Sequence, residues 1–179
     1  MGIVKRCLGM LGLLLCVVGK SVAQTPTNID NYTYQHSWNY AVGQDSMFCS
    51  EDGTMDFFEN GTALDHALQR YELHRVDGSR VVWYFDYYSP SFWRLDGDNF
   101  YFRGEEQTFS MTLLSDTNAA KGLAPAEYKE YAQRIIANVS RSIGHETCFK
   151  VADLSDCRLV WSYTYSDGHT DTWEFVRKR

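Results

Sequence analysis

The stretch VVWYFDYYSPSFWRLDGDNFYFRG, residues 81–104, combines ten aromatic side chains with one Asp-Gly turn. Two sets of side chains alternate along its first half: Val81, Trp83, Phe85 and Tyr87 in one set, and Val82, Tyr84, Asp86 and Tyr88 in the other. Because successive side chains of a strand point to opposite faces, this period of two predicts a β-strand. Ser89-Pro90-Ser91 is expected to end that strand, residues 92–95 resume the pattern, and the turn at 96–99 leads into a further strand.

The same alternation recurs on both sides of this stretch, interrupted at short intervals by turn residues. Asn60-Gly61, Asp77-Gly78 and Asp167-Gly168 are hairpin signals, because these residue types tolerate positive φ angles. Helix competes with strand over residues 63–73, but the hairpin turns on either side favour a strand. One face of the last two strands is rich in rings: Trp161, Tyr163, Tyr165, Trp173 and Phe175. At least eight strands are implied, in the order of an antiparallel meander.

Residues 125–143 do not follow this period. Their apolar residues recur every three or four positions, at Tyr128, Ala132, Ile135, Val139 and Ile143. This spacing predicts an amphipathic helix, with Pro125 in its first turn. Gly144 is expected to end the helix in the αL conformation. The apolar stripe of this helix must pack against the sheet.

The first 23 residues have the features of a secretory signal peptide. Lys5 and Arg6 precede an apolar run, and Ser21-Val22-Ala23 offers small residues for cleavage after Ala23. The apolar run is shorter than the about 20 residues that a spanning helix needs, and no later segment approaches that length. We therefore expect a secreted or periplasmic mature protein that does not span a membrane, although association with the cell surface stays open.

The charge and the length of the chain limit its expected partners and its number of domains. Three of the 17 basic residues lie in the signal peptide, which leaves 14 against 23 acidic residues and a net charge of −9. Nucleic acid and anionic membrane surfaces are therefore not expected as partners. The other 156 of the 179 residues suit one domain. We expect a loose leader at 24–33 and a single β-barrel domain at 34–179.

Three cysteines follow the signal peptide: Cys49, Cys148 and Cys157. Secretion permits a disulfide. On paired strands, Cys148 and Cys157 would be offset by several residues, which exceeds the Cα separation of about 7 Å that a bridge tolerates. A disulfide would then join Cys49 to one of the other two, and three buried thiols are the equal alternative.

Four features of the chain follow one another in a recognisable order: Trp38, EDGTMDFFENGT (51–62), FWRLDGDNFYF (92–102) and VADLSDCRLVWSYTYSDGHTDTWEFVRK (151–178). Together they resemble the short lipocalin-like domains of secreted bacterial proteins. The Gly-x-Trp signature of true lipocalins is absent, and the helix lies between strands. The resemblance implies a mainly β, antiparallel, up-and-down lipocalin-like barrel of about eight or more strands with one amphipathic helix packed on it. Such closure also removes exposed sheet edges.

An eight-stranded barrel is just wide enough for side chains to fill it or for one small ligand to enter. The inward-facing rings predict a ligand-binding interior formed by Trp83, Phe85, Tyr87, Trp93, Phe102, Trp161, Tyr163 and Trp173. The hydroxyls of Tyr87, Tyr163 and Tyr165 would orient a ligand at the mouth. Alternatively, the rings simply pack against one another and against the helix.

No catalytic motif is recognised, and neither a metal nor a cofactor is expected. His145 and Cys148 have a spacing that a metal could use, but no second pair completes a site. Residues 96–99 resemble a calcium loop without its glycine and its closing glutamate, so they are expected to form a turn. Asp65 with Glu72, or Asp86 with Asp98, could meet as a catalytic acid pair, although spacing alone does not establish the geometry.

The sequence thus predicts a secreted, non-enzymatic lipocalin-like protein that binds a small hydrophobic or amphipathic ligand in the barrel. The alternative is a structural or protein-interaction module of the cell envelope with a filled barrel. Its contact residues would be the outward-facing Tyr84, Tyr88 and Tyr101. A large open cavity would favour the binder, and a filled interior would favour the module.

Overall fold

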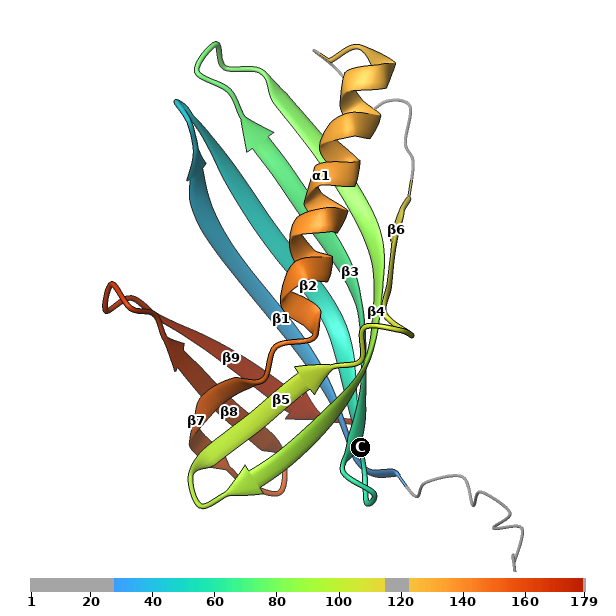
Figure 1. The fold of residues 1–179 in the computed structure, drawn as a ribbon. Coiled ribbons are helices and arrows are strands. Elements are labelled where there is room, and N and C mark those ends of the chain that lie inside the picture. Colours follow the sequence, from blue (N-terminus) through green and yellow to red (C-terminus); the bar gives the residue numbers. More distant parts are fainter. Residues whose placement is uncertain (1–27, 115–122, 179) are drawn as a thin grey trace, which may run out of the picture.

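The computed structural model describes residues 28–114 and 123–178, so the expected signal peptide lies outside the described residues. Nine strands and one helix occur within these ranges (Figure 1): β1 (Asn28–Val42), β2 (Asp45–Phe58), β3 (Thr62–His74), β4 (Arg80–Asp96), β5 (Asn99–Gly104), β6 (Ser110–Leu113), α1 (Pro125–Ile143), β7 (Thr147–Leu154), β8 (Arg158–Thr164) and β9 (Thr170–Arg177). Within the described ranges, no helix is long and apolar enough to cross a membrane.

Eight of the strands form a closed antiparallel barrel. Their order around the barrel is β1-β2-β3-β4-β5-β7-β8-β9, and β9 pairs with β1 to close it. The ninth strand, β6, pairs with residues 85–88 of β4. The predicted fold class is therefore confirmed, and the Gly residues of the expected hairpin turns, Gly61, Gly78 and Gly168, have positive φ. Gly97 in the 96–99 turn does as well.

Strand β4 continues through Pro90, so the expected break at residues 89–91 is wrong. Pro90 lies where the partner of β4 changes from β6 to β5. The Pro90 carbonyl accepts a hydrogen bond from the Glu105 N–H at 2.7 Å. In an antiparallel strand the nitrogen and the carbonyl of one residue point to the same side, so the Pro90 nitrogen also faces this side. A strand proline needs a position where no ladder N–H is required, and this gap between two partners provides one.

The expected loose leader at 24–33 is corrected for the part that the structure describes, because residues 28–33 belong to β1. Tyr32 is buried there and pairs with Met55 of β2 and Arg177 of β9. Pairing on both sides satisfies the backbone of this segment, so it is part of the barrel.

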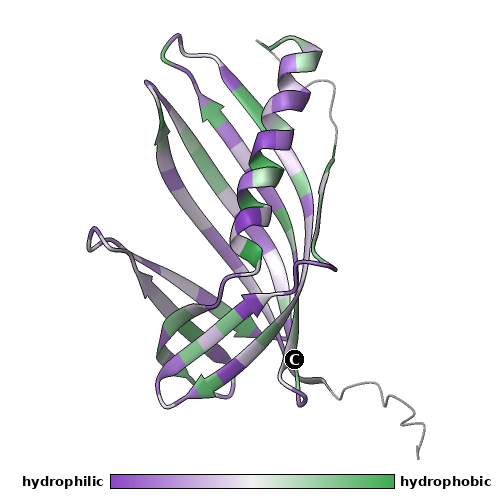
Figure 2. Cartoon of the chain, viewed as in Figure 1, coloured by the Kyte–Doolittle hydropathy of each residue, from purple (hydrophilic) through white to green (hydrophobic). Residues whose placement is uncertain are grey.

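The inward-facing side chains form two hydrophobic clusters. One fills the closed end of the barrel and includes Tyr34, Phe57, Phe100, Trp161 and Phe175. The other lies between α1 and the free ends of β2, β3 and β4. Figure 2 shows hydrophobic and hydrophilic residues alternating along these strands, as the period of two requires. The packed interior thus consists of rings at one end and a helix at the other.

Helix α1 has the predicted bounds, and Tyr128, Ala132, Ile135 and Ile143 are buried as expected. The Trp83 indole Nε1–H donates to the Tyr128 carbonyl at 3.0 Å, and the Tyr128 hydroxyl donates to the Val82 carbonyl at 3.0 Å. The expected αL ending is wrong, because Gly144 has a φ of −74°. The Glu106 side chain lies over Gly144, where a Cβ would displace its flexible, exposed carboxylate end.

The cysteine expectations also need correction. Among the described residues, Cys49, Cys148 and Cys157 are all free thiols, so Cys49 is not in a disulfide. Cys49 is buried on β2, whereas the other two are exposed, so the alternative of three buried thiols holds for Cys49 alone.

Candidate functional site

The barrel opens on one side, between β1 and β9. These strands pair at three positions, from Tyr32 opposite Arg177 to Tyr34 opposite Phe175. Beyond Tyr34, β1 continues to Val42, and the hairpin of β8 and β9 diverges from it (Figure 1). We call the opening between residues 35–42 of β1 and residues 170–174 of β9 the seam.

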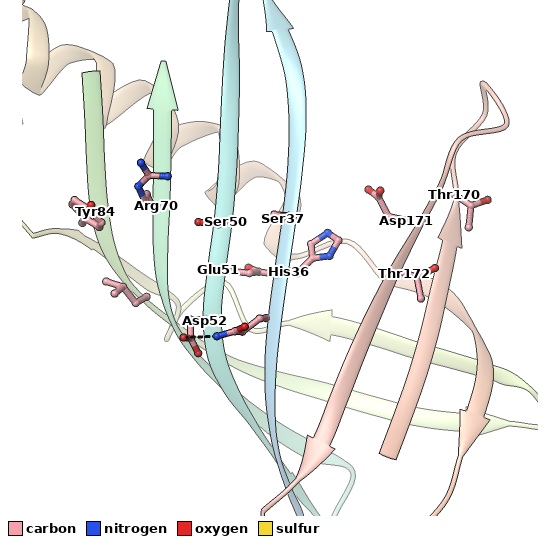
Figure 3. A pocket seen from close by; sticks show the side chains of 12 residues that line it. His36, Ser37, Ser50, Glu51, Asp52, Arg70, Tyr84, Thr170, Asp171 and Thr172 are labelled. Carbon is pink, nitrogen blue, oxygen red and sulfur yellow. Dashed lines mark hydrogen bonds between the residues drawn. The ribbon is translucent and has the colours of Figure 1, made fainter. Parts of the chain in front are cut away.

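A cleft of ≈ 740 Å³ lies along the seam (Figure 3). Much of its wall comes from the outer face of β1 to β4: Gln35, Ser37, Ser50, Asp52, Leu68, Arg70 and Tyr84. Strand β9 contributes Thr170, Asp171 and Thr172, while His36 and Glu51 reach the cleft from the inward-facing set of β1 and β2. A cavity of ≈ 610 Å³ extends along the seam toward Trp38, Tyr40 and Tyr165. The seam therefore connects the outside to polar groups of the barrel interior.

Glu51 is the carboxyl group at the centre of this arrangement. It occupies an inward-facing position of β2, between the buried Cys49 and Met55 of the same face. Gln69 Nε2 donates a hydrogen bond to Glu51 Oε2 at 3.2 Å. Burial raises the pKa of Glu51 to about 7, and the hydrogen bonds from Gln69 and Trp173 oppose this rise. Glu51 can therefore change its charge near neutral pH.

Asp65 is a second inward-facing carboxyl group, on β3. The Tyr34 hydroxyl donates to Asp65 Oδ1 at 2.7 Å. Burial raises the pKa of Asp65 to about 8, and the negative charge of Glu51 adds to this rise. A Cβ at Gly53 would lie 2.8 Å from the Tyr34 ring, so this glycine lets the ring cross β2 to reach Asp65.

His36 joins the two sides of the seam. Its ring centroid lies 4.4 Å from that of Trp173 on β9 and 5.4 Å from that of Trp38 on β1. Burial lowers the pKa of His36, while Asp171 and a hydrogen bond to the Thr172 backbone act in the opposite direction. The three rings provide a wall on which a flat group can stack.

The two cavities at the seam are acidic. They are lined by the carboxyl groups of Glu51, Asp52, Asp167 and Asp171, against the single arginine Arg70 among the described lining residues. Asp52 accepts from Gln35 at 3.0 Å, and Asp171 accepts from the Tyr165 hydroxyl at 3.0 Å. An excess of carboxyl groups beside aromatic rings suits a positively charged ligand.

The predicted ligand-binding residues are divided between several places. Trp83 and Phe85 are buried in the cluster beneath α1, and Phe102 and Trp161 belong to the closed-end cluster. Trp93 lies beside Phe57 and Phe100, and its Nε1–H donates to the Thr62 carbonyl at 2.8 Å. None of these five residues lines the two seam cavities.

The other three predicted ligand-binding residues differ in their distance from the seam. Trp173 contacts His36 and therefore lies beside the cleft, whereas Tyr163 packs on Phe149 and Tyr165. Tyr87 is buried against Phe109, so it does not place its hydroxyl at a mouth. Tyr165, also expected at the mouth, lines the cavity of ≈ 610 Å³ that extends the seam.

Neither predicted acid pair forms. Asp65 faces inward and Glu72 outward on β3, and Asp86 contacts His66 at 2.8 Å. The presence of two inward-facing carboxyl groups, Glu51 and Asp65, whose charges interact was not predicted, although the sequence carries a signal for it. Both residues occupy positions at which the alternation of their strands demands an apolar side chain.

Among the described residues, no group of three or more His, Cys, Asp and Glu side chains could hold a metal ion. Comparison with protein-family models finds no match, and comparison with curated proteins finds no similar sequence. The fold and the seam together define an antiparallel β-barrel with a lateral, acidic, ring-lined cleft.

Proposed function

We propose that this protein is a secreted, non-enzymatic, lipocalin-like binding protein whose ligand is a small amphipathic molecule with a flat ring and a positive charge. The observation that carries the proposal is the position of Glu51. An inward-facing carboxyl group with a raised pKa reaches a ring-lined cleft at the stretch of the barrel where β1 and β9 part.

The seam is favoured over the barrel axis because side chains fill most of the axis and leave a small apolar cavity of ≈ 130 Å³ beside Phe57, Trp93 and Phe100. Trp161 lies 4.5 Å from Phe100 and 4.3 Å from Phe175 between ring centroids, and α1 covers the other cluster. The seam cleft, at ≈ 740 Å³, falls within the range of about 300–1,000 Å³ that small-molecule sites occupy. A ligand therefore has room beside β1 rather than among the predicted rings.

The chemistry of the cleft supports a cationic ligand. Glu51 and Asp171 would face the positive charge, while the rings of His36 and Trp38 would stack on the flat part. Cations also interact favourably with the face of a tryptophan ring, most strongly where water is displaced. The net charge of −6 for the whole chain would favour the approach of such a ligand.

The lipocalin-like assignment and secretion belong to the same proposal. They are supported by the eight-stranded antiparallel barrel, by the turn motifs at residues 51–62 and 92–102, and by the features of residues 1–23. Lipocalin-like barrels typically hold one small ligand, which suits a binder better than an enzyme.

The proposal is tested with proflavine, a flat cationic dye whose fluorescence reports on its surroundings. We expect saturable binding at pH 8 that Glu51→Gln weakens about tenfold, which corresponds to one lost charge contact of about 1.4 kcal/mol. Glu59→Gln, in the exposed turn after β2, removes the same charge away from the seam and should leave the affinity unchanged. A linear titration, or equal affinities for both variants, would contradict the proposal.

A second function, from another class, is favoured by the filled interior and by outer-face apolar side chains. Leu68, Tyr88 and Phe92 are exposed on neighbouring β3 and β4. They suit a protein-interaction module of the cell envelope. Tyr84 is half-buried in the cleft wall, and Tyr101 lies beneath Arg94. Loss of a purified partner on changing Tyr84 and Tyr88 to Ser would support the module, and unchanged partners would count against it.

A further inference from the structure

A cluster of positive side chains lies on the outer face of the barrel, near the turn between β3 and β4. Arg70, Glu72 and His74 alternate on β3, and Arg80 pairs with His74 at the start of β4. These side chains face away from the hydrophobic clusters, because the inward positions of β3 are its odd-numbered residues. This local group of basic side chains contrasts with the net charge of −6 of the whole chain.

Arg70, His74 and Arg80 converge on one carboxylate. His74 Nε2 and Arg80 Nη1 each lie 3.0 Å from Glu72 Oε1, and Arg70 Nη2 contacts Glu72 Oε2. The Glu72 side chain is 3 % exposed, whereas that of Arg80 is 63 % exposed. Glu72 therefore forms the floor of the cluster, and the cationic groups reach beyond it toward solvent.

The Glu72 carboxylate occupies only a few of the N–H donors that Arg70 and Arg80 offer. A guanidinium group has five N–H donors, and within the described residues Arg70 and Arg80 each form one ion pair, with Glu72. With His74 neutral, two arginines and one carboxylate leave a net charge of +1. Neutralising Glu72 requires one positive charge, so the second arginine has no counter-charge within the cluster.

A cleft of ≈ 350 Å³ lies over these groups. Asn39 and Ser46 line it beside the cationic side chains and offer neutral hydrogen-bonding groups. Phe48 packs below Arg70, whose guanidinium carbon lies 5.8 Å from the ring centroid. Glu72 and Phe48 thus hold the arginines in position before any ligand arrives, which lowers the entropy cost of binding.

We propose that Arg70, His74 and Arg80, held by Glu72, bind a tetrahedral oxyanion, either free phosphate or sulfate or the phosphate group of a small ester. The planar donors of arginine match the oxygen geometry of such groups. Arg70 borders both this cleft and the seam cleft, whereas His74 and Arg80 line this cleft and neither seam cavity. The oxyanion site therefore adjoins the seam, but it does not use Glu51, on which the function proposed above depends.

Calorimetric titrations of the folded protein with inorganic phosphate, inorganic sulfate and glycerol 2-phosphate, each at constant ionic strength in chloride, test this site. We expect saturable binding that Arg80→Gln weakens about tenfold, as loss of one charge-assisted contact implies. Arg103→Gln removes an exposed arginine that stacks on Phe92 and should leave binding unchanged. Tighter binding of the ions than of the ester would identify a free ion as the ligand, and the reverse order would identify an ester.

Two results would overturn the proposal. One is the absence of saturable binding by all three probes. The other is equal weakening by Arg80→Gln and Arg103→Gln, which would show a general effect of charge. Because Arg80→Gln could also lower stability, Glu72→Gln provides a second test: it frees the arginines from their carboxylate, so added phosphate should raise its melting temperature more than that of the wild type. An equal rise in both proteins would likewise contradict the site.

Discussion

The closed end of the barrel and the seam are built from the same strands but have opposite interiors. At the closed end, Tyr34 of β1 packs on Phe175 of β9 with ring centroids 5.0 Å apart, and these two residues are also partners in the pairing of the strands. At the next inward position of β1, His36 faces the cleft at the seam. The character of the interior thus changes within two residues, at the point where pairing between β1 and β9 ends.

This contrast explains where polar groups can be placed inside a barrel. Carboxyl groups buried without water lose solvation, so the closed end has rings and the seam has Glu51 and His36. Asp65 lies between the two regions and depends on Tyr34 for its hydrogen bond. Packing should therefore dominate the energetics of the closed end, and charge should dominate those of the seam.

The largest effect is expected for Trp161→Ala at the closed end. Trp161 is 4 % exposed and contacts the rings of Phe100, Phe149 and Phe175. Removing it should lower the free energy of unfolding by about 3–5 kcal/mol, measured by urea denaturation. Tyr88→Ala, on the outer face, is the matched control and should cost less than about 1 kcal/mol. Similar losses of unfolding free energy in both variants would contradict the claim that packing at the closed end dominates stability.

Asp65→Asn tests whether the free energy of unfolding depends on pH through the buried Asp65 carboxyl group. The folded pKa of Asp65, about 8, lies above its unfolded value near 3.9, so the folded state binds the extra proton. Between pH 6 and pH 8, Asp65 should therefore make the free energy of unfolding fall by about 2 kcal/mol as pH rises. Stability curves of the Asn variant should lack this slope and exceed the wild type most at pH 8. Parallel curves for the two proteins would show an ordinary Asp65 pKa.

Gly53→Ala tests how the polar pair is positioned. The new Cβ would lie 2.8 Å from the Tyr34 ring and from the Ala67 Cβ, so it should displace the ring from Asp65. Overpacking of this kind typically costs about 1–3 kcal/mol in unfolding free energy. The ultraviolet absorbance of Tyr34 should also shift as its hydroxyl loses its hydrogen bond to the Asp65 carboxyl group. Gly78→Ala is the comparison variant, because Gly78 lies at a turn with open space around it. Any loss of stability in that variant comes from backbone strain at positive φ rather than from overpacking, and the Tyr34 absorbance should not change.

The smallest effect concerns the ligand. Glu51 becomes charged as pH rises through about 7, so the affinity for proflavine should increase about tenfold between pH 6 and pH 8 and then level off. The affinity of Glu51→Gln should stay constant over this range. A pH dependence that persists in the variant would assign the titration to another group, such as His36.

Much of the fold could be predicted because alternation and turns are local. Residues 81–88 have the predicted faces, residues 63–73 form a strand, and the helix has the predicted ends. Pro90 could not be placed correctly, since its tolerance depends on an exchange of partner strands that lie elsewhere in the chain. Local pattern therefore determined the elements, and long-range pairing determined their continuity.

The site was less accessible to sequence reasoning. Rings such as Trp83 and Trp161 were correctly placed inside, but their identity does not reveal whether they leave space between them. The polar breaks at Glu51 and Asp65 were visible in the alternation. Their approach to a cleft depends on where β1 and β9 separate, and these strands begin 142 residues apart, at Asn28 and Thr170.

Nuclear magnetic resonance titration of the Glu51 side-chain carboxyl carbon tests the seam most directly. In the free protein this signal should titrate with a pKa near 7, and saturating proflavine should lower that pKa because a bound cation favours the charged carboxylate. A Glu51 pKa near its ordinary value, about 4.3, that proflavine leaves unchanged would contradict a seam built to hold a cation.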